Sequence, residues 1–286
     1  MIERLCVIGV GLIGGSLARA VREAGICQEV VGAGRNPQNL QTAIDLGVID
    51  RYETDLARAV AGADMVLVSV PLGAMAAVFD AIKGHLAEHA VVTDAGSAKG
   101  SVIDAVRQAF GVVPAFFVPG HPIAGTEQSG VEASFASLYR GSRVILTPLA
   151  DTDSYALDRV RDMWEAAGAE VIEMDSVHHD AVLAATSHLP HVLAYALVDS
   201  LARLSDDGEV FEYAAGGFRD FTRIASSDPV MWRDICLANG DAIQLMIENY
   251  VADLQELTAA IENRDGQQIL KLFTSAKAAR DRYVEK

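Results

Sequence analysis

The sequence predicts an α/β protein in two parts, a doubly wound parallel sheet followed by an all-helical region. Up to about residue 175, short runs rich in Val, Ile and Leu alternate with amphipathic segments. This alternation is typical of a parallel sheet with helices on both faces. Beyond that point only long segments with apolar residues at helical spacing follow. We therefore expect one domain at residues 1–175 and a second at residues 176–286.

Each expected strand is a short apolar run bounded by Gly, Pro or a charged residue, and each expected helix has one apolar face. The expected strands, in order, are residues 5–8, 30–33, 65–70, 91–94, 116–118, 144–147 and 170–173. The expected helices of the first domain are residues 12–23, 74–86, 101–110 and 155–167. Those of the second domain are residues 180–189, 191–204, 232–261 and 266–284.

Composition excludes several classes of protein. Hydrophobic residues make up 51% of the 286 residues, which is enough for a packed core. The formal net charge is −16 and no basic stripe is present, so we expect no nucleic-acid partner. Apolar stretches are broken before the ~18 residues that a membrane span needs, so we expect no membrane association. The three cysteines form no C-x-x-C pair, which indicates a cytoplasmic protein without a metal site.

A glycine-rich turn follows the first strand and opens a helix. The order Gly9-x-Gly11-x-x-Gly14 in a strand–turn–helix context predicts a dinucleotide site of the Rossmann type. Gly9 allows the tight turn, Gly11 lets the backbone approach the pyrophosphate, and Gly14 lets helix and strand pack closely. Leu12 and Ile13 stand at the helix N-terminus, where free N–H groups bind phosphate. A glycine-rich turn without a ligand is the alternative.

The end of the second strand bears on the choice of cofactor. NAD-preferring sites place an acidic residue there, against the ribose hydroxyls. Here Gly34 stands at that position and Arg35 follows it. An arginine can pair with a 2′-phosphate, so we expect NADP to be preferred over NAD. The alternative is a solvated Arg35 and loose binding of NAD.

Two further strand ends are expected to line the cofactor, because ligands of open α/β sheets lie beyond the carboxyl ends of the strands. The expected residues are Ser69, Val70 and Pro71 at the end of one strand and Asp94 and Gly96 at the end of another.

His121 follows the run at 116–118 in a Gly- and Pro-rich segment, which we interpret as a loop at the same edge of the sheet. A histidine there is a candidate general base with an ordinary pKa near ~6.5. A lone histidine is more often structural, so the neighbouring motifs decide.

Several motifs together resemble the prephenate/arogenate (cyclohexadienyl) dehydrogenase family, over the whole length of the chain. They are Gly-Leu-Ile-Gly-Gly-Ser at 11–16, Thr-Asp-Ala-Gly-Ser-Ala-Lys at 93–99, Gly-His-Pro-Ile-Ala-Gly-Thr-Glu at 120–127, Ser-His-Leu-Pro-His at 187–191, Gly-Phe-Arg-Asp-Phe-Thr-Arg-Ile-Ala at 217–225 and Asp-Pro-Val-Met-Trp at 228–232. The resemblance implies oxidative decarboxylation of prephenate or arogenate with NAD(P)+, giving 4-hydroxyphenylpyruvate or tyrosine in tyrosine biosynthesis. The sequence does not separate the two substrates.

The resemblance also implies roles for individual residues. His121 would accept a hydrogen bond from the ring hydroxyl as hydride leaves, and Ser97 would bind that hydroxyl or orient His121. Arg223 would bind a carboxylate of the small anionic substrate, although internal pairing with Asp220 is the alternative. The remaining substrate-binding residues would be His188, His191, Glu127, Arg219, Asp220 and Trp232. Arg219 departs from the lysine expected in some relatives, which changes the geometry but keeps the charge.

Other assignments stay open at this point. His188 and His191 share one helix face, but without a third ligand we expect no metal. A β-hydroxyacid dehydrogenase or imine reductase would place Lys or Asp on the interdomain helix, where this chain has the segment 187–191. A non-catalytic dinucleotide-sensing regulator is the alternative from another class. The apolar faces of the second domain predict a homodimer formed through its helices.

Overall fold

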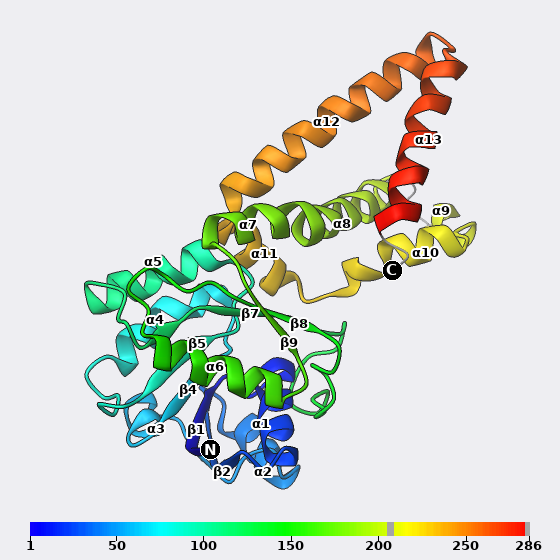
Figure 1. The fold of residues 1–286 in the computed structure, drawn as a ribbon. Coiled ribbons are helices and arrows are strands. Elements are labelled where there is room, and N and C mark those ends of the chain that lie inside the picture. Colours follow the sequence, from blue (N-terminus) through cyan, green and yellow to red (C-terminus); the bar gives the residue numbers. More distant parts are fainter. Residues whose placement is uncertain (205–208, 284–286) are drawn as a thin grey trace. The chain divides into compact units, whose positions relative to one another are not determined.

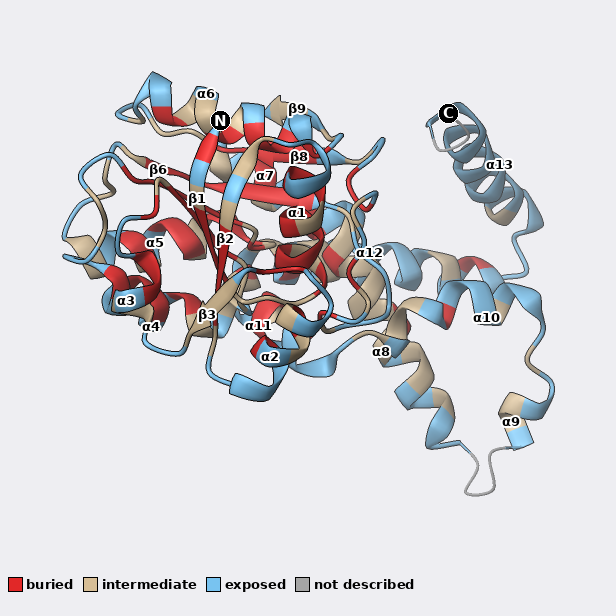
Figure 2. Ribbon diagram, turned by 90° about the horizontal axis from the view of Figure 1, so that it is seen from below, coloured by how far each residue is buried: buried red, intermediate tan, exposed pale blue. Residues whose placement is uncertain are grey.

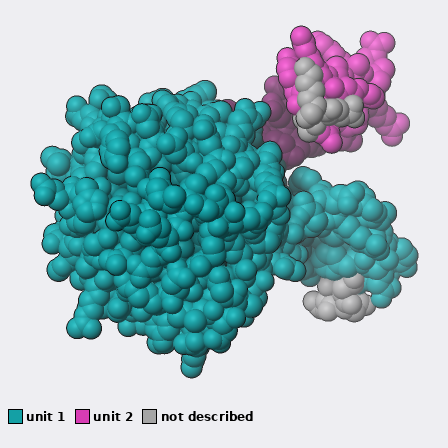
Figure 3. All heavy atoms as spheres, turned by 60° about the horizontal axis from the view of Figure 1, so that its bottom comes forward, with its two compact units in different colours: residues 1–240 teal, residues 241–286 magenta. Residues whose placement is uncertain are grey.

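The computed structural model describes residues 1–204 and 209–283. The chain forms two compact units, residues 1–240 and residues 241–286 (Figure 3). The first unit contains the sheet together with the helices that follow it up to Gly240. The domain boundary expected near residue 175 stays a prediction. Val284, the end of the last expected helix, lies outside the described residues.

Within the described residues, a six-stranded parallel sheet forms the centre of the first unit, in the order β3-β2-β1-β4-β5-β6 (Figure 1). The chain starts in the middle of the sheet, builds one half, and then builds the other half from β1 outwards. This is the doubly wound order of dinucleotide-binding folds, and it confirms the predicted fold class. The strands are β1 (Ile2–Ile8), β2 (Cys27–Ala33), β3 (Arg51–Glu53), β4 (Met65–Val68), β5 (Val91–Asp94) and β6 (Phe117–Val118).

Helices cover both faces of this sheet, and alternate strand residues pack into two separate cores. Leu5 and Val7 of β1 enter one core, whereas Cys6 and Ile8 enter the other, as the period of two along a strand requires. Figure 2 shows the strands and the inner faces of the covering helices as buried. The first core is covered by α1 (Leu12–Glu23), α2 (Pro37–Asp45) and α6 (Ser154–Ala166), and the second by α3 (Leu56–Val60), α4 (Leu72–Ile82) and α5 (Lys99–Phe110).

The last expected strands do not extend the parallel sheet. They join β7 (Gly120–Ile123) in a three-stranded sheet of β7, β8 (Arg143–Leu146) and β9 (Glu170–Glu173). In β7, His121 pairs antiparallel with Ile145, so the expected loop around His121 is a strand. This strand was not predicted, because its Gly and Pro residues are more typical of a loop. Pro122 is tolerated because β7 lies at the edge of its sheet.

A helical run follows β9, and its hydrogen-bonding pattern changes from α to π and back midway. It consists of α7 (Ser176–Leu183), a π-helical turn (Ala184–His188) and α8 (Leu189–Ala202). The π turn ends two residues before Pro190, which lacks an N–H and disturbs the preceding turn. The run is long and apolar enough, by length and composition alone, to cross a membrane. Because it carries the buried His179 and His188, we treat it as a helix of the folded first unit.

Shorter helices complete the first unit, and one expected helix is divided. The expected helix at residues 232–261 is broken at Asn239, whose backbone leaves the helical conformation (φ −118°, ψ 35°) and whose side chain donates to the carbonyl oxygen of Asp180 (2.8 Å). The remaining elements are α9 (Glu209–Glu212), α10 (Gly216–Thr222), a 3-10 turn (Arg223–Ser226) and α11 (Pro229–Ala238).

The second unit is a helical hairpin with little internal core. It contains α12 (Gly240–Glu262) and α13 (Gly266–Tyr283), joined by a turn in which Arg264 has a positive φ of 53°. In the described residues, α12 buries only Ile243 and Ala260, and α13 buries none (Figure 2). Many of its large apolar side chains, among them Leu254, Leu270 and Phe273, are therefore exposed in the single chain.

Candidate active site

The glycine loop between β1 and α1 has the geometry of a phosphate cradle. Gly9 has a φ of 97°, and a Cβ added there would lie 2.5 Å from the carbonyl oxygen of Ser69. A Cβ on Gly14 would lie 2.7 Å from Val7, so this glycine is required by packing of the helix on the strand. A Cβ on Gly11 would meet nothing within 4 Å. Gly11 therefore borders open space at the start of α1, where the N–H groups of Leu12 and Ile13 have no partner in the helix.

The end of β2 has the arrangement that the sequence predicts for residues 34 and 35. Gly34 follows β2 and is half-buried, and the Arg35 side chain is exposed. Among the described residues, no hydrogen bond or ion pair holds the Arg35 guanidinium. The adjacent Asn36 caps α2 by accepting from the N–H of Gln38 (2.9 Å). The end of β2 thus offers the exposed guanidinium of Arg35 and no acidic residue at position 34 or 35, which fits a dinucleotide with or without a 2′-phosphate.

The other expected cofactor residues lie at neighbouring strand ends. Ser69 follows β4, and its Oγ donates to the carbonyl oxygen of Gly9 (2.8 Å), tying the two loops together. Val70 and Pro71 lead from there into α4. Gly96 donates its N–H to Asp94 Oδ2 (2.7 Å) in the loop after β5.

The Asp94 carboxylate binds other groups of the protein. It is fully buried and forms an ion pair with Lys99, which is also fully buried, at 2.5 Å. Asp94 Oδ1 accepts from the N–H of Gly120 (3.1 Å), and Lys99 Nζ donates to the Gly120 carbonyl oxygen (2.6 Å). Burial lowers the pKa of Lys99, and Asp94 opposes that shift. This pair fixes the start of β7 against β5, a role that the sequence analysis did not assign to Lys99.

His121 is buried, with 9% of its surface exposed. Its Nδ1 lies 2.9 Å from Nε2 of His179, and in the described residues its Nε2 has no hydrogen bond to another protein group. Burial holds the pKa of His121 well below the ordinary value of 6.5, and the neighbouring His179, Lys99 and His188 lower it further. His121 is therefore neutral at physiological pH with Nε2 available to a ligand.

Ser97 stands in the loop between β5 and α5, two residues before Lys99. Its side chain is half-buried, and no hydrogen bond to its hydroxyl is found in the described part of the chain. The hydroxyl is thus free for a ligand.

His179 and Asp180 were not singled out from the sequence, although both contact the site. His179 on α7 is fully buried, and its Nδ1 lies 2.8 Å from Asp180 Oδ1. Burial raises the pKa of Asp180, but its hydrogen bonds with His179 and with the N–H groups of Lys99 and Gly100 outweigh that effect and lower the pKa. The His178-His179-Asp180 triplet was the available sequence signal.

His188, His191 and Trp232 form one aromatic cluster. The rings of His191 and Trp232 stack at 3.7 Å, and the His188 and Trp232 rings meet edge to face at 6.2 Å. Asn239 Nδ2 lies 3.2 Å from His188 Nδ1. Burial lowers the pKa of His188 to about 4. His188 Nε2 and the Trp232 indole nitrogen are buried without a hydrogen-bond partner in the described residues, which is how groups reserved for a ligand or water look in a protein alone.

The remaining expected substrate residues are more exposed. Arg223 forms an ion pair with Glu127, not with Asp220. Arg219 and Asp220 lie on the exposed side of α10. The Arg223–Glu127 pair is itself exposed on both sides, so it is weak and a substrate carboxylate can replace Glu127.

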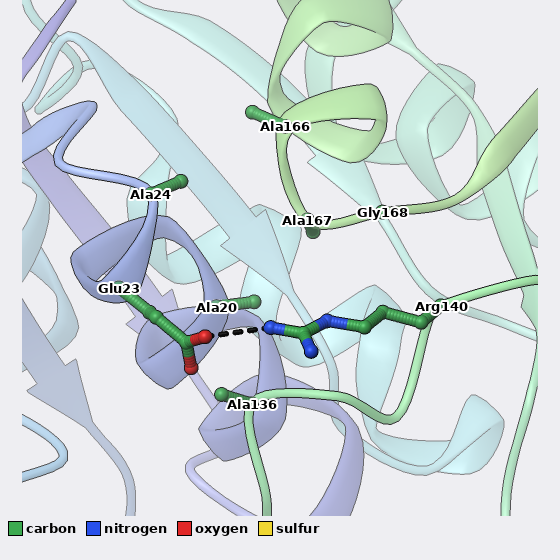
Figure 4. A pocket seen from close by; sticks show the side chains of 8 residues that line it. All are labelled: Ala20, Glu23, Ala24, Ala136, Arg140, Ala166, Ala167 and Gly168. Carbon is green, nitrogen blue, oxygen red and sulfur yellow. Dashed lines mark hydrogen bonds and ion pairs between the residues drawn. The ribbon is translucent and has the colours of Figure 1, made fainter.

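A small pocket elsewhere in the first unit contains none of these residues. It has a volume of about 150 Å³ and is crossed by the ion pair between Arg140 and Glu23 (2.6 Å), which Figure 4 shows. Its lining is Ala20, Glu23, Ala24, Ala136, Arg140, Ala166, Ala167 and Gly168. The carboxylate in this lining, Glu23, is already paired with Arg140, and the lining contains none of the expected site residues, so we do not consider it a catalytic site.

Two family models match the chain. The model described as prephenate dehydrogenase, nucleotide-binding domain, matches residues 17–173, and the model described as prephenate dehydrogenase, dimerization domain, matches residues 175–275.

Known proteins are similar over nearly the whole chain. A cyclohexadienyl dehydrogenase of Zymomonas mobilis is 38% identical over 284 residues, which are 97% of this chain and 95% of that protein. A crystal structure of prephenate dehydrogenase from A. aeolicus in complex with hydroxyphenyl propionate and NAD+ has a TM-score of 0.91 and 38% identity, with 98% of each chain covered. The arogenate dehydrogenase of Synechocystis has a TM-score of 0.81 and 26% identity, covering 98% of this chain and 100% of that one.

Proposed function

Because this chain belongs to the prephenate dehydrogenase family, we propose that the residues around His121 carry out its oxidative decarboxylation of a cyclohexadienyl acid in tyrosine biosynthesis. The observation that carries this assignment is His121 itself. It is buried and neutral, and its free Nε2 belongs to a strand that Asp94 and Lys99 fasten to the carboxyl end of β5. In a doubly wound fold this is the edge where the dinucleotide and substrate meet.

His121 Nε2 accepts the hydrogen bond of the ring hydroxyl, and Ser97 holds the same hydroxyl from the loop after β5. As hydride leaves the carbon that bears the hydroxyl, the hydroxyl becomes acidic and its proton moves towards His121. The nicotinamide, when bound, supplies the hydride acceptor. The electrons of the bond to the departing carboxylate complete the aromatic ring. The proton returns to the oxygen, since the product is a phenol, and no net proton is released.

The remaining residues bind and orient the substrate. Arg223 exchanges Glu127 for a substrate carboxylate. His188 and Trp232 supply buried nitrogens without a hydrogen-bond partner in the described residues, and His191 stacks on Trp232. Glu127, Arg219 and Asp220 complete the proposed wall. The protein thus positions the substrate and excludes water while the cofactor carries out the redox chemistry.

A turnover assay tests the proposed function. The protein is incubated with prephenate or arogenate, each with NAD+ or NADP+, while reduced nicotinamide and carbon dioxide are measured. We expect at least one combination to release both products in equal amounts. Absence of turnover in all four combinations would refute the proposal. The alternative functions receive no support from the relatives, which carry the names of prephenate, arogenate and cyclohexadienyl dehydrogenases.

For the cofactor, we propose NADP in preference to NAD. The support is the unpaired, exposed Arg35 beside Gly34, where an acidic residue would favour NAD. We predict a higher kcat/KM with NADP, and a smaller difference between the cofactors in Arg35→Ala. Arg58→Ala, another exposed arginine, serves as the control. A preference of the wild type for NAD by about tenfold or more contradicts this prediction, since one charge-assisted bond is worth that much.

We further propose a cytoplasmic homodimer, with the second domain at residues 176–286 as its interface. The match to a dimerization domain and the exposed apolar hairpin support this assembly.

A further inference from the structure

His121, His179 and Asp180 form a row of three groups in hydrogen-bonding distance. The two contacts measure 2.9 Å between the imidazoles and 2.8 Å between His179 and the carboxylate. His121 and His179 are both buried, and the row joins β7 to α7. A buried contact between imidazole nitrogens requires that one nitrogen donates and the other accepts.

The hydrogen bonds of Asp180 determine which nitrogen donates and which accepts in each contact of the row. Asp180 Oδ1 accepts the N–H of Lys99 (2.7 Å), and Oδ2 accepts the N–H of Gly100 (2.8 Å), both in the first turn of α5. With two backbone donors fixed on it, the carboxylate can only accept from His179. The proton of His179 therefore lies on Nδ1, and its Nε2 carries the lone pair.

The same reasoning extends to His121. Since His179 Nε2 accepts, His121 Nδ1 must donate, and its Nε2 is left without a proton. This is the nitrogen that has no protein partner and that the proposed reaction needs as an acceptor. A buried carboxylate that selects the reactive tautomer of a histidine has a parallel in serine proteases, here with one more imidazole inserted.

We propose that His179 and Asp180 are positioning residues that hold His121 in the tautomer with a free Nε2 and stabilise it when it takes up the hydroxyl proton. The inference rests on the proposed function of His121. The proton stays on His121 Nε2 during the step. The Asp180 carboxylate stabilises the positive charge through the hydrogen bonds of His179. Besides these two residues, the titratable groups near His121 in the described residues are Lys99 at the start of α5 and His188 in the π turn. Asp94 at the end of β5 binds the N–H of the adjacent Gly120.

Two substitutions of His179 separate positioning from packing. In His179→Gln, the acceptor-only Asp180 attracts the amide NH2 group, so the amide oxygen can face His121 and keep its tautomer. In His179→Leu, His121 loses its acceptor. We expect kcat to fall by about 10–100-fold in the Leu variant, as when a metal-bound histidine loses the partner that orients it, and to recover mostly in the Gln variant. KM and cofactor affinity should change little in either.

His178→Leu is the matched control, because His178 is the exposed neighbour on the same helix. It should keep wild-type kcat. Equal kcat in His179→Leu and wild type would overturn the proposal, as would a Gln variant as inactive as the Leu variant.

Nitrogen-15 NMR of histidine-labelled wild type gives a second reading that needs no turnover. We expect the His121 signals, assigned by their loss in His121→Asn, to show a protonated Nδ1 and an unprotonated Nε2. A protonated Nε2 would overturn the proposed positioning of His121 by His179 and Asp180. Because this spectrum is recorded without substrate, it tests the positioning separately from the proposed function, which the turnover assay tests.

Discussion

His121 is kept neutral by its surroundings. Its ordinary pKa near ~6.5 would leave a large charged fraction in slightly acidic solution. Burial and the charges of His179, Lys99 and His188 lower that pKa well below 6.5. Since the neutral form is the active one and the pKa is lowered, activity should persist as the pH falls through 6.5.

Substitution of Arg223 should change KM and kcat differently from substitution of His121. It binds a carboxylate that is present in both ground and transition states, so its loss removes uniform binding. We predict that Arg223→Ala raises KM by roughly 10–150-fold, the value of one charge-assisted bond, with a smaller effect on kcat. Steady-state kinetics checks this, with Arg107→Ala as an exposed control, since Arg107 pairs with Asp104. An unchanged KM would exclude Arg223 from substrate binding.

At the residue scale, residues expected to face a ligand could be recognised from the sequence. Residues that contact one another inside the protein were harder to recognise. His121, Ser97 and Arg223 stand in recognisable motifs. Lys99 lies in such a motif too, but its burial with Asp94 depends on β7 returning beside β5. His179 was missed for the same reason, because its partner His121 lies 58 residues away in the chain.

At the element scale, the β1–α1 loop separates glycines that serve packing from one that serves a ligand. In Gly14→Ala the new Cβ would lie 2.5 Å from the Gly9 carbonyl oxygen, whereas in Gly11→Ala it meets no protein atom within 4 Å. We predict that Gly14→Ala lowers thermal stability. Gly11→Ala should keep the wild-type melting temperature but weaken cofactor binding by about tenfold or more, because the pyrophosphate must approach there.

Differential scanning fluorimetry and cofactor titration measure the two effects. A Gly11→Ala protein that binds the dinucleotide as tightly as wild type would contradict the proposed cradle.

The elements themselves were predictable where local pattern decides. The parallel strands other than β3, together with α1, follow from periodicity and the glycine turn, and the structure has them near the expected residues. The short edge strand β3 (Arg51–Glu53) was not among the expected strands. The separation of β7, β8 and β9 into a second sheet was not predictable, because it depends on which strand pairs with β8. The break at Asn239 likewise depends on a distant partner, Asp180.

At the scale of the whole molecule, the exposed hairpin predicts assembly. Leu254 of α12 is 43% exposed, and Leu270 and Phe273 of α13 are 66% and 55% exposed. Apolar surface of this kind marks an interaction site. We predict a dimer of twice the chain mass of 30.4 kDa by light scattering, and a shift towards monomer in Phe273→Asp.

Leu46→Asp is the control for this test, since Leu46 is similarly exposed (42%) but lies in the first unit. A monomer at micromolar concentration in the wild type would contradict the proposed assembly.

The central claim, that His121 is the proton acceptor, is tested most directly by the pH dependence of kcat and kcat/KM in His121→Asn. His121 acts on charge that develops only as hydride leaves, so both constants should fall together by about 10²–10⁴-fold with little change in KM. In the wild type, kcat/KM should fall on the acid side well below pH 6.5, and this fall should be absent in the variant. If His121→Asn raises only KM, or keeps the acid-side fall, the acceptor is another group.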